Sequence, residues 1–311
     1  MLTVYAIGAD SERYSLSAAQ SLVLCKDVST PADSLCAVFP QEVCEELAEI
    51  YVYDGDEIVF SGVVDEQIIY AGDKVRTEII ARNKAALLLD NEAEPAVYIN
   101  PSAELIFRRY LRPLGIDNYA GENKAYPGEF KVQKGISCWK VAENFCVGTY
   151  GTVPYVRDGT VFFQGEKSNG GLFFSCDSKD GIVFTSFQRN IRRCKLLSRV
   201  RVKTRVGDSY SVEVENPDAL GRGIHRERYL NASEYSAQSL AVADEMIASS
   251  VNSSEESEVC CPLRLTDVLR SEARVEYSEG EYLSGLCVSS LRYSLSSAGE
   301  STKLVLKRKE K

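Results

Sequence analysis

The chain has 311 residues, of which 44% are hydrophobic and 26% are charged. These fractions are ordinary for globular proteins, so they exclude a disordered chain and a fibrous repeat, and the length favours about two domains. The formal net charge is −9. This acidic balance argues against electrostatic binding of nucleic acid by the molecule as a whole.

The N-terminal residues and the apolar runs of the chain suggest no secretion signal and no membrane span. Residues 1–9 have no basic n-region and no apolar h-region, and the longest purely apolar run, residues 85–89, is far short of the roughly 20 residues that span a bilayer. We therefore expect a soluble protein that has no membrane partner and is not secreted through a signal peptide.

The cysteines are numerous, but none forms a C-x-x-C pair of the kind that zinc and thioredoxin-like sites use. Most lie in apolar stretches, so we expect reduced side chains that act as small buried hydrophobes in a cytosolic product. The adjacent Cys260 and Cys261 are the pair to check against the structure. The ten residues are Cys25, Cys36, Cys44, Cys138, Cys146, Cys176, Cys194, Cys260, Cys261 and Cys287.

Residues 2–81 predict a β-domain. Asp54-Gly55 lies between two β-prone runs and predicts a tight hairpin over residues 52–60, because glycine accepts positive φ. A second hairpin is expected from residues 62–70 and 74–81. A short helix at 82–89 follows, and Pro95 ends the unit.

The next segment predicts a small α/β domain, residues 93–185. Asn100 and Pro101 form a cap and a first-turn proline for a helix that ends at residues 113–115. Ser137 begins a second helix that Gly148 ends. Strand-like pieces at 152–156 and 160–164 surround Asp158-Gly159.

Strand patterns return from residue 186, beginning with a basic run that contains no acid before Asp208. Contact with nucleic-acid phosphates is one interpretation. The alternative, which we favour, is a hairpin over residues 199–215 with its turn at 207–209, in which opposite charges face each other. Its register would pair Val206 with Tyr210, Lys203 with Glu213, and Arg201 with Glu215.

The rest of the chain predicts a helix at 233–251, a polar loop at 252–258 and a terminal hairpin at 285–307. The terminal hairpin resembles the one at 62–80, since each has a glycine, a strand, an Ala-Gly-acid turn and a second strand. This similarity suggests that the first and last domains share one design.

No residue set predicts an enzyme. His225 is the only histidine, so any catalytic triad or multi-histidine metal site must include it, and its charged surroundings favour a solvated side chain. Motifs of the G-x-S-x-G, G-x-x-x-x-G-K-[ST] and G-x-G-x-x-G kinds are absent from the sequence. The neighbouring acids Glu45-Glu46 and Glu255-Glu256 are expected to be solvated. We therefore predict no catalytic, cofactor-binding or metal-binding residues.

Residues 53–66, with Phe60-Ser-Gly62-Val-Val-Asp65 at their centre, resemble the hairpin pair in the first barrel of baseplate hub proteins of contractile phage tails, the late-control D type. Further similar segments follow in the same order along the chain, and the likeness is stronger in 50–116 than in 207–260. These segments are residues 81–95, Asn100-Pro-Ser, Leu114-Gly-Ile116, residues 139–145 with the Asp158-Gly159 hairpin, and residues 292–306.

The resemblance implies an α+β, mainly β fold with two similar antiparallel, tube-like β-barrel domains, residues 1–92 and 186–311. Residues 93–185 would be an inserted α/β domain, and a helical and loop insertion would lie around 217–262. It also implies a structural, non-enzymatic role in a virion or a phage-tail-like particle such as a bacteriocin, assembled in the bacterial cytoplasm.

The partners implied by the resemblance are two further copies of the chain, the tail tube, the central spike and other baseplate proteins. Three chains with two similar barrels each would present a quasi-six-fold face to the six-fold tube. A lumen with fixed negative charge would repel passing DNA. Two alternatives remain: a tail-associated cell-wall hydrolase, and a nucleic-acid-binding module built on the basic strand.

Overall fold

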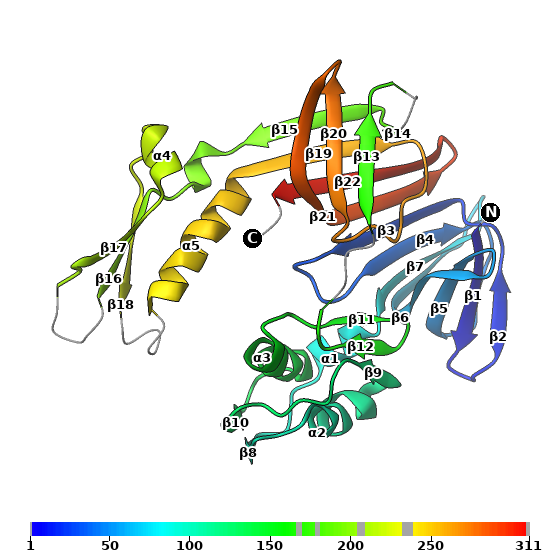
Figure 1. Ribbon diagram of the computed structural model, residues 1–311. Coiled ribbons are helices and arrows are strands. Elements are labelled where there is room, and N and C mark those ends of the chain that lie inside the picture. Colours follow the sequence, from blue (N-terminus) through cyan, green and yellow to red (C-terminus); the bar gives the residue numbers. More distant parts are fainter. Residues whose placement is uncertain (1, 166–169, 178–180, 204–208, 232–238, 309–311) are drawn as a thin grey trace. The chain divides into compact units, whose positions relative to one another are not determined.

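The computed structural model describes residues 2–165, 170–177, 181–203, 209–231 and 239–308 and shows a mainly β protein with a few helices (Figure 1). The chain divides into two compact units, each built from separated stretches. Unit 1 comprises Met1–Asn169, Pro262–Arg270 and Ser290–Thr302, and unit 2 comprises Gly170–Cys261, Ser271–Ser289 and Lys303–Lys311. Among the described residues, no helix has both the length and the apolar composition needed to cross a membrane.

An antiparallel sheet in the order β3-β4-β7-β6-β5-β1-β2 forms the β part of unit 1. Buried and exposed side chains alternate along its strands, so one face builds a hydrophobic core that includes Leu22 and Leu24. β3 also pairs with residues 290–295 of the long strand β21 (Glu281–Ser296). The other strands are β1 (Leu2–Gly8), β2 (Arg13–Leu16), β3 (Ser21–Asp27), β4 (Ser34–Phe39), β5 (Leu47–Asp54), β6 (Glu57–Tyr70) and β7 (Arg76–Asn83).

Both hairpins predicted in this sheet are confirmed. β5 and β6 meet at a turn in which Asp54 pairs with Glu57 and Gly55 has a φ of 61°. β6 then continues unbroken to Tyr70 and pairs with β7 from Gly62 to the end of the strand. The turn residues were therefore a sufficient local signal for both hairpins.

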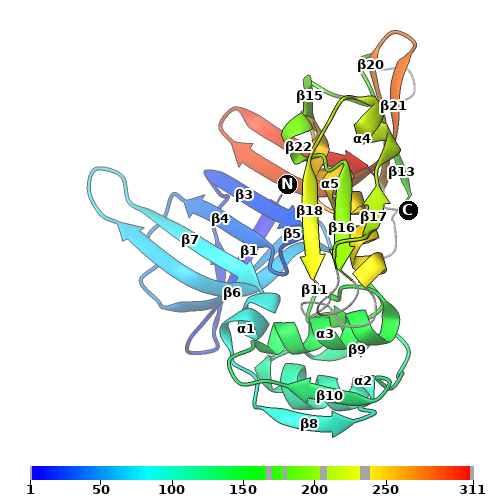
Figure 2. The same cartoon turned by 90° about the vertical axis from the view of Figure 1, so that its left-hand side faces the viewer.

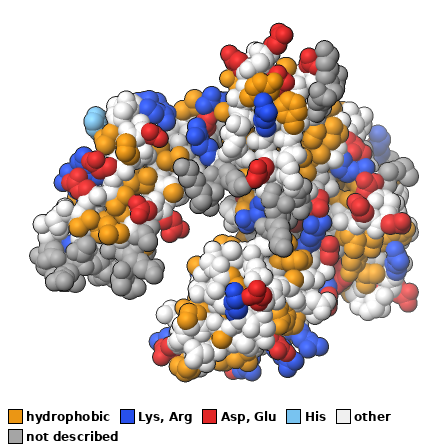
Figure 3. Space-filling view, in the orientation of Figure 1, with side chains coloured by type: hydrophobic (Ala, Val, Ile, Leu, Met, Phe, Trp, Pro, Cys, Tyr) orange, Lys and Arg blue, Asp and Glu red, His pale blue; other side chains and the backbone are white. Residues whose placement is uncertain are grey.

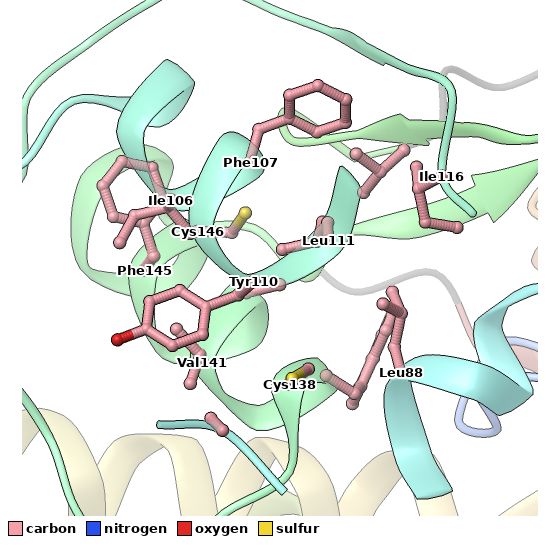
Figure 4. Close-up of a cluster of buried hydrophobic side chains, with 14 of the residues drawn as sticks. Leu88, Ile106, Phe107, Tyr110, Leu111, Ile116, Cys138, Val141, Phe145 and Cys146 are labelled. Atoms are coloured by element: carbon pink, nitrogen blue, oxygen red, sulfur yellow. The ribbon is translucent and has the colours of Figure 1, made fainter. Parts of the chain in front are cut away.

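The remainder of the described N-terminal segment forms a second hydrophobic core within unit 1. Side chains from α1, α2 and α3 pack together in it, and Phe145 of α3 is fully buried among them (Figure 4). The elements are α1 (Ala85–Asp90), β8 (Ala96–Ile99), α2 (Ala103–Ile106), a π-helical turn (Phe107–Leu111), a 3-10 turn (Arg112–Leu114), β9 (Asn118–Ala120), β10 (Glu129–Val132), α3 (Cys138–Tyr150), β11 (Tyr155–Arg157) and β12 (Thr160–Phe162).

Two predicted helix ends in this core were wrong. The first helix is capped by Ser102, whose hydroxyl accepts a hydrogen bond from the Leu105 N–H, whereas the Asn100 side chain accepts one from Gly128. The second helix begins after Ser137 as predicted but ends at Gly151, which has the left-handed conformation. Gly148 lies inside that helix, where an added Cβ would come within 2.3 Å of the Tyr126 ring. It is there for close packing and does not terminate the helix.

Unit 2 contains a sheet and a separate helix-covered layer. The sheet contains both parallel and antiparallel strand pairs: β13 pairs in parallel with β14 and β20, while β15 and β20 pair antiparallel with β19 and β21. These strands are β13 (Gly171–Ser175), β14 (Ile182–Val183), β15 (Ser186–Ile191), β19 (Glu255–Cys261), β20 (Glu272–Ser278) and β22 (Gly299–Arg308), with the first part of β21.

The separate layer is a three-stranded sheet, in the order β17-β16-β18, with α5 packed on one face. Val200 and Val202 of the central strand are fully buried beneath the helix. The elements are a 3-10 turn (Arg193–Lys195), β16 (Arg199–Lys203), β17 (Val212–Glu215), α4 (Pro217–Gly221), β18 (Glu227–Asn231) and α5 (Ser239–Ser254).

The predicted hairpin at 199–215 is present, but its register is wrong by two residues. Arg201 pairs with Glu213 and Arg199 pairs with Glu215. A two-residue shift keeps every side chain on its predicted face, since the strand period is two. The predicted Val206–Tyr210 pair and the start of the turn lie outside the described residues.

The predicted polar loop at 252–258 was also wrong. α5 continues to Ser254 and β19 begins at Glu255. The hydroxyls of Ser253 and Ser254 donate to the carbonyls of Ser249 and Val251, so this polar stretch is satisfied within the helix. The start of the predicted helix at 233 lies outside the described residues, and the terminal hairpin is confirmed as β21 and β22.

The described strands do not close into a barrel within either unit, because their paths end at β2 in unit 1 and at β14 and β15 in unit 2. The predicted barrels are therefore open sheets. The glycines that suggested a repeat also differ in role: Gly62 is buried against β7, whereas Gly285 has a φ of 72° and open space around it. The boundaries 1–92, 93–185 and 186–311 stay a prediction, and β13, from the predicted insert, pairs with β20.

Candidate assembly surfaces

The structure explains why Gly62 and Asp65 occur in residues 53–66, the segment that carries the resemblance. A Cβ at Gly62 would lie 2.2 Å from the carbonyl oxygen of Arg82 on β7, so no larger residue fits this strand pairing. Asp65 accepts two hydrogen bonds from the Arg82 guanidinium, at 2.7 and 2.9 Å. The same guanidinium also bonds Asp90 of α1 at 2.7 Å. The motif therefore anchors the β6–β7 hairpin to the first helix.

The far end of this hairpin is a candidate contact surface. Figure 2 shows β6 and β7 reaching beyond β3 and β4. Ile69 and Val75 near its tip are 40% and 39% exposed. The Arg76 guanidinium lies 4.2 Å from the centre of the Tyr70 ring, and the Tyr70 hydroxyl donates to Glu78 at 3.0 Å. These contacts stiffen an arm that presents apolar side chains to solvent.

Sheet edges are the second kind of candidate surface. In the described part of the chain, β2 pairs only with β1, β14 only with β13, and β15 only with β19. An edge strand presents unpaired backbone groups on which a neighbouring chain can add a strand. β15 has six residues and carries Ile191, which is 52% exposed, whereas β14 has only two residues. β15 is thus the better edge for strand addition.

The basic strand that suggested phosphate binding is largely neutralised within unit 2. Arg199 lies 3.2, 2.6 and 3.1 Å from Glu213, Glu215 and Glu227. Arg201 lies 3.4 Å from Glu213 and 3.2 Å from Glu227. The hydrogen bond to Glu215 raises the pKa of Arg199 above its usual value. These arginines therefore form a cross-strand ion-pair network, as the self-paired interpretation predicted.

The expectation that Glu255 and Glu256 are solvated was wrong. Glu255 is bonded by Arg189 of β15 and Arg308 of β22, and Glu256 is bonded by Arg192 at 3.1 Å. Partial burial acts to raise the pKa of Glu255, but the hydrogen bonds from Arg308 and Arg189 outweigh it and hold the pKa below its usual value. These acids join three strands of the sheet.

The other residues weighed for chemistry lie apart from one another. His225 is exposed, and so are Glu45 and Glu46. Within the described ranges, no group of three or more His, Cys, Asp or Glu side chains is arranged to hold a metal ion. Unit 1 has a cavity of about 330 Å³ that Asp33 and Trp139 line. Burial raises the pKa of Asp33, but the cavity lining mixes both signs of charge and brings none of the sequence candidates together.

The cysteines follow the prediction only in part. Cys138, Cys146 and Cys261 are buried, whereas three others are exposed and four are half-buried. Burial, and then the neighbouring Cys260, raise the pKa of Cys261 to about 11. Cys260 and Cys261 are free thiols. Because consecutive strand residues point to opposite faces, we interpret them as packing residues. The exposed three are Cys44, Cys176 and Cys194.

One charged surface was missed by the sequence interpretation. Arg193 and Lys195 were counted within the basic strand, but the structure places them in a 3-10 turn before it, near Arg222 and Arg226. The local signal was the stretch from Arg222 to Arg228, which contains three arginines and one acid. Its connection to residues 193–195 depends on the fold.

Solved structures of other proteins match this chain over nearly its whole length. A tail protein from Neisseria meningitidis MC58 is 17% identical with a TM-score of 0.73, and the match covers 99% of this chain and 96% of that one. A 43 kDa tail protein of prophage MuSo2 from Shewanella oneidensis is 12% identical with a TM-score of 0.77, covering 98% of both chains.

The third is the Escherichia coli c3393 protein, described as a component of the type VI secretion system with structural similarity to the T4 bacteriophage tail proteins gp27 and gp5. It is 9% identical with a TM-score of 0.54, and the match covers 94% of this chain and 74% of that one. No protein-family model and no curated protein sequence matches the chain. The fold is therefore the one found in phage tail proteins and type VI secretion tail components, and the resemblance seen in the sequence is confirmed at the level of fold.

Proposed function

We propose that this protein is a structural hub of the baseplate of a contractile tail, in a phage or in a phage-tail-like bacteriocin. The observation that carries the proposal is the fold match to two tail proteins over 96% and 98% of their lengths. The protein would act by shape and contact and would need no cofactor.

In this proposal, three copies form a ring that joins the tail tube to the central spike. Residues 1–92 and 186–311 supply two β-rich domains per chain, and residues 93–185 form the insert. The sheets of a single chain are open, so neighbouring copies complete the tube-like wall. Three chains with two such domains each match a six-fold tube on one side and a three-fold spike on the other.

The alternative of a nucleic-acid-binding module loses its main support, because Arg199 and Arg201 are paired with glutamates. For the hydrolase alternative, exposed His225 lies in a stretch with no nucleophile motif. The net charge of −9 suits a wall that repels DNA passing through the ring.

Imaging of the assembled particle tests this function. We expect three-fold density for the hub between tube and spike, with three copies per baseplate by mass. Six copies, or a position away from the tail axis, would overturn the proposal. Lysis of cell-wall substrate by the purified chain would favour the hydrolase.

A further inference from the structure

Unit 2 carries a compact patch of positive charge that the carboxylates of the described residues leave unneutralised. We define the basic patch as Arg193, Lys195, Arg222, Arg226 and Arg228, all of which are exposed. Arg193 donates to the carbonyl of Arg222 at 2.8 Å, and Arg226 donates to the carbonyl of Cys194. No described carboxylate forms an ion pair with any of the five, and Figure 3 shows blue Lys and Arg side chains over α4.

The patch borders a hollow that is lined in part by apolar side chains. Lys195 and Arg228 line a shallow hollow of about 510 Å³ together with Leu197 and with Val242 and Met246 of α5, and the same helix adds Glu245 and three serines to the lining. Cations beside apolar side chains suit an acidic segment of protein, which supplies carboxylates and aliphatic carbon together. A phosphate backbone would use the cations alone.

Unit 1 carries a patch of the opposite sign. We define the acidic patch as Asp10, Glu12, Glu42, Glu45 and Glu46, all exposed and none in an ion pair with a described lysine or arginine. The segments meet because the N–H of Ala9 donates to the carbonyl of Glu46 at 2.8 Å. Asp10, Glu45 and Glu12 also act together on Tyr14, whose pKa rises to about 12, mainly through its hydrogen bond to Asp10.

We propose that the basic patch of one chain binds the acidic patch of the next chain in the hub ring. The proposal rests on the proposed function, because a ring of identical chains uses two different surfaces on each subunit, and each surface repeats around the ring. The two patches have opposite sign and five charged groups each. In a closed ring, each chain therefore pairs its basic patch with one neighbour and its acidic patch with the other. Charge complementarity of this kind sets the partner and the register of docking.

Zero-length crosslinking tests the contact directly. Carbodiimide joins a carboxylate to an amine, and Lys195 is the one amine in the basic patch. We would mix unlabelled and ¹⁵N-labelled full-length chains, crosslink them in 50 mM salt, and sequence the linked peptides. We expect mixed-isotope links between Lys195 and residues 10–12 or 42–46. Links found only within one isotope, or from Lys195 only to other regions, would overturn the proposal.

Charge reversal supplies the second arm. Arg193→Glu, Arg226→Glu and Arg228→Glu in one chain should raise the concentration for half-maximal assembly by about tenfold or more at low salt, since like charges would then meet. The triple change Glu42→Lys, Glu45→Lys and Glu46→Lys should do the same. A chain that carries all six changes should regain assembly, because its two patches are again complementary.

A matched control reverses three exposed cations outside the patch, Arg112, Lys131 and Lys134, each to Glu, with the same change in net charge. It should assemble like the wild type. Where the purified chain stays monomeric, the same variants are compared by the yield of complete particles. An equal loss of assembly in the control variant would overturn the contact. Failure of the chain with all six charge reversals to regain assembly would overturn it as well.

The outcomes separate this contact from the proposed function. If wild-type particles contain a three-fold hub and both triple variants still assemble normally, the patch contact is overturned and the hub function stands. Particles without this chain in a three-fold ring would overturn the hub itself. Retention of DNA by the purified chain, lost in the arginine triple variant, would instead assign the basic patch to nucleic acid and overturn the proposal.

Discussion

Substitution of Gly62 by alanine should destabilise unit 1 although it adds only one methyl group. The new Cβ would lie 2.2 Å from the Arg82 carbonyl oxygen, 2.7 Å from its carbon and 2.9 Å from the Phe60 ring. Ordinary contacts of this kind lie beyond 3 Å, so β6 and β7 must separate locally. The nearest atoms belong to backbone, which cannot rotate away as a side chain can.

The loss of stability depends on where the β6–β7 pairing lies in the sheet. β7 lies between β4 and β6, so moving it at Arg82 strains ladders on both sides. The Arg82 guanidinium also bonds Asp65 and Asp90, and a backbone shift would disturb these bonds. Overpacking in a sheet of this kind costs about 1–3 kcal/mol. For a chain of this size, that corresponds to a fall in melting temperature of about 2–4 °C per kcal/mol.

Thermal and urea unfolding followed by circular dichroism would measure the effect. Gly171→Ala on β13 is the matched control, because a Cβ there has nothing within 4 Å and its backbone needs no positive φ. We expect the control to lie within about 0.5 kcal/mol of the wild type. If Gly62→Ala unfolds at the same urea concentration as the control, the close-approach argument is wrong.

Three further predictions address charge, thiols and assembly. Glu255→Gln should lower stability at pH 7 by about 1–3 kcal/mol, because it removes charged hydrogen bonds to Arg189 and Arg308. Because the pKa of Glu255 is lower in the folded chain than its value near 4.5 in the unfolded chain, its ionised carboxylate stabilises the fold above about pH 4.5, and this stability is lost as the pH falls below that value. The free energy of unfolding of the variant, measured in urea, should therefore depend less on pH in this acidic range than that of the wild type. Ellman's reagent at pH 8 should label the three exposed thiols first, and Cys261 should be modified only on unfolding. Val305→Pro in β22, which lies between β19 and β21, should abolish particle formation by removing a ladder donor at a cost of about 3 kcal/mol or more. His225→Ala should leave particle yield and killing or lysis unchanged, and a loss of activity with normal assembly would reveal an enzyme.

Local signals explain which parts of the fold the sequence predicted. Asp54-Gly55 and Asp158-Gly159 specify tight turns through positive φ, and alternation in the flanking strands places their faces. Ser137 was found because an N-cap needs only the backbone N–H three residues ahead. Such features depend on a few neighbouring residues, so a single sequence suffices.

Features that depend on distant partners were not predicted. The register of the 199–215 hairpin is set partly by Glu227 on β18, which pairs with Arg199 from a parallel neighbour that turn chemistry does not reveal. The first helix passes through π and 3-10 turns before its end at Gly115, and Ser102, which caps it, was masked by the stronger Asn-Pro signal. The patches used for the proposed contact each combine segments that are brought together only by the fold.

In the proposed ring, the open sheets limit how neighbouring copies can meet. An exposed edge invites uncontrolled pairing, and proteins suppress it with short strands and charge. β2 has four residues and contains Arg13, β14 has two residues, and β15 contains Arg189, which is held by Glu255. Strands of this kind are poor templates for indiscriminate addition. The surfaces with unneutralised charge are the ones that can select a partner at a distance and fix its orientation before any strands meet. Assembly of the proposed hub should therefore weaken with salt before it responds to changes at the edges, because salt screens the charges of the exposed patches and has little effect on strand pairing.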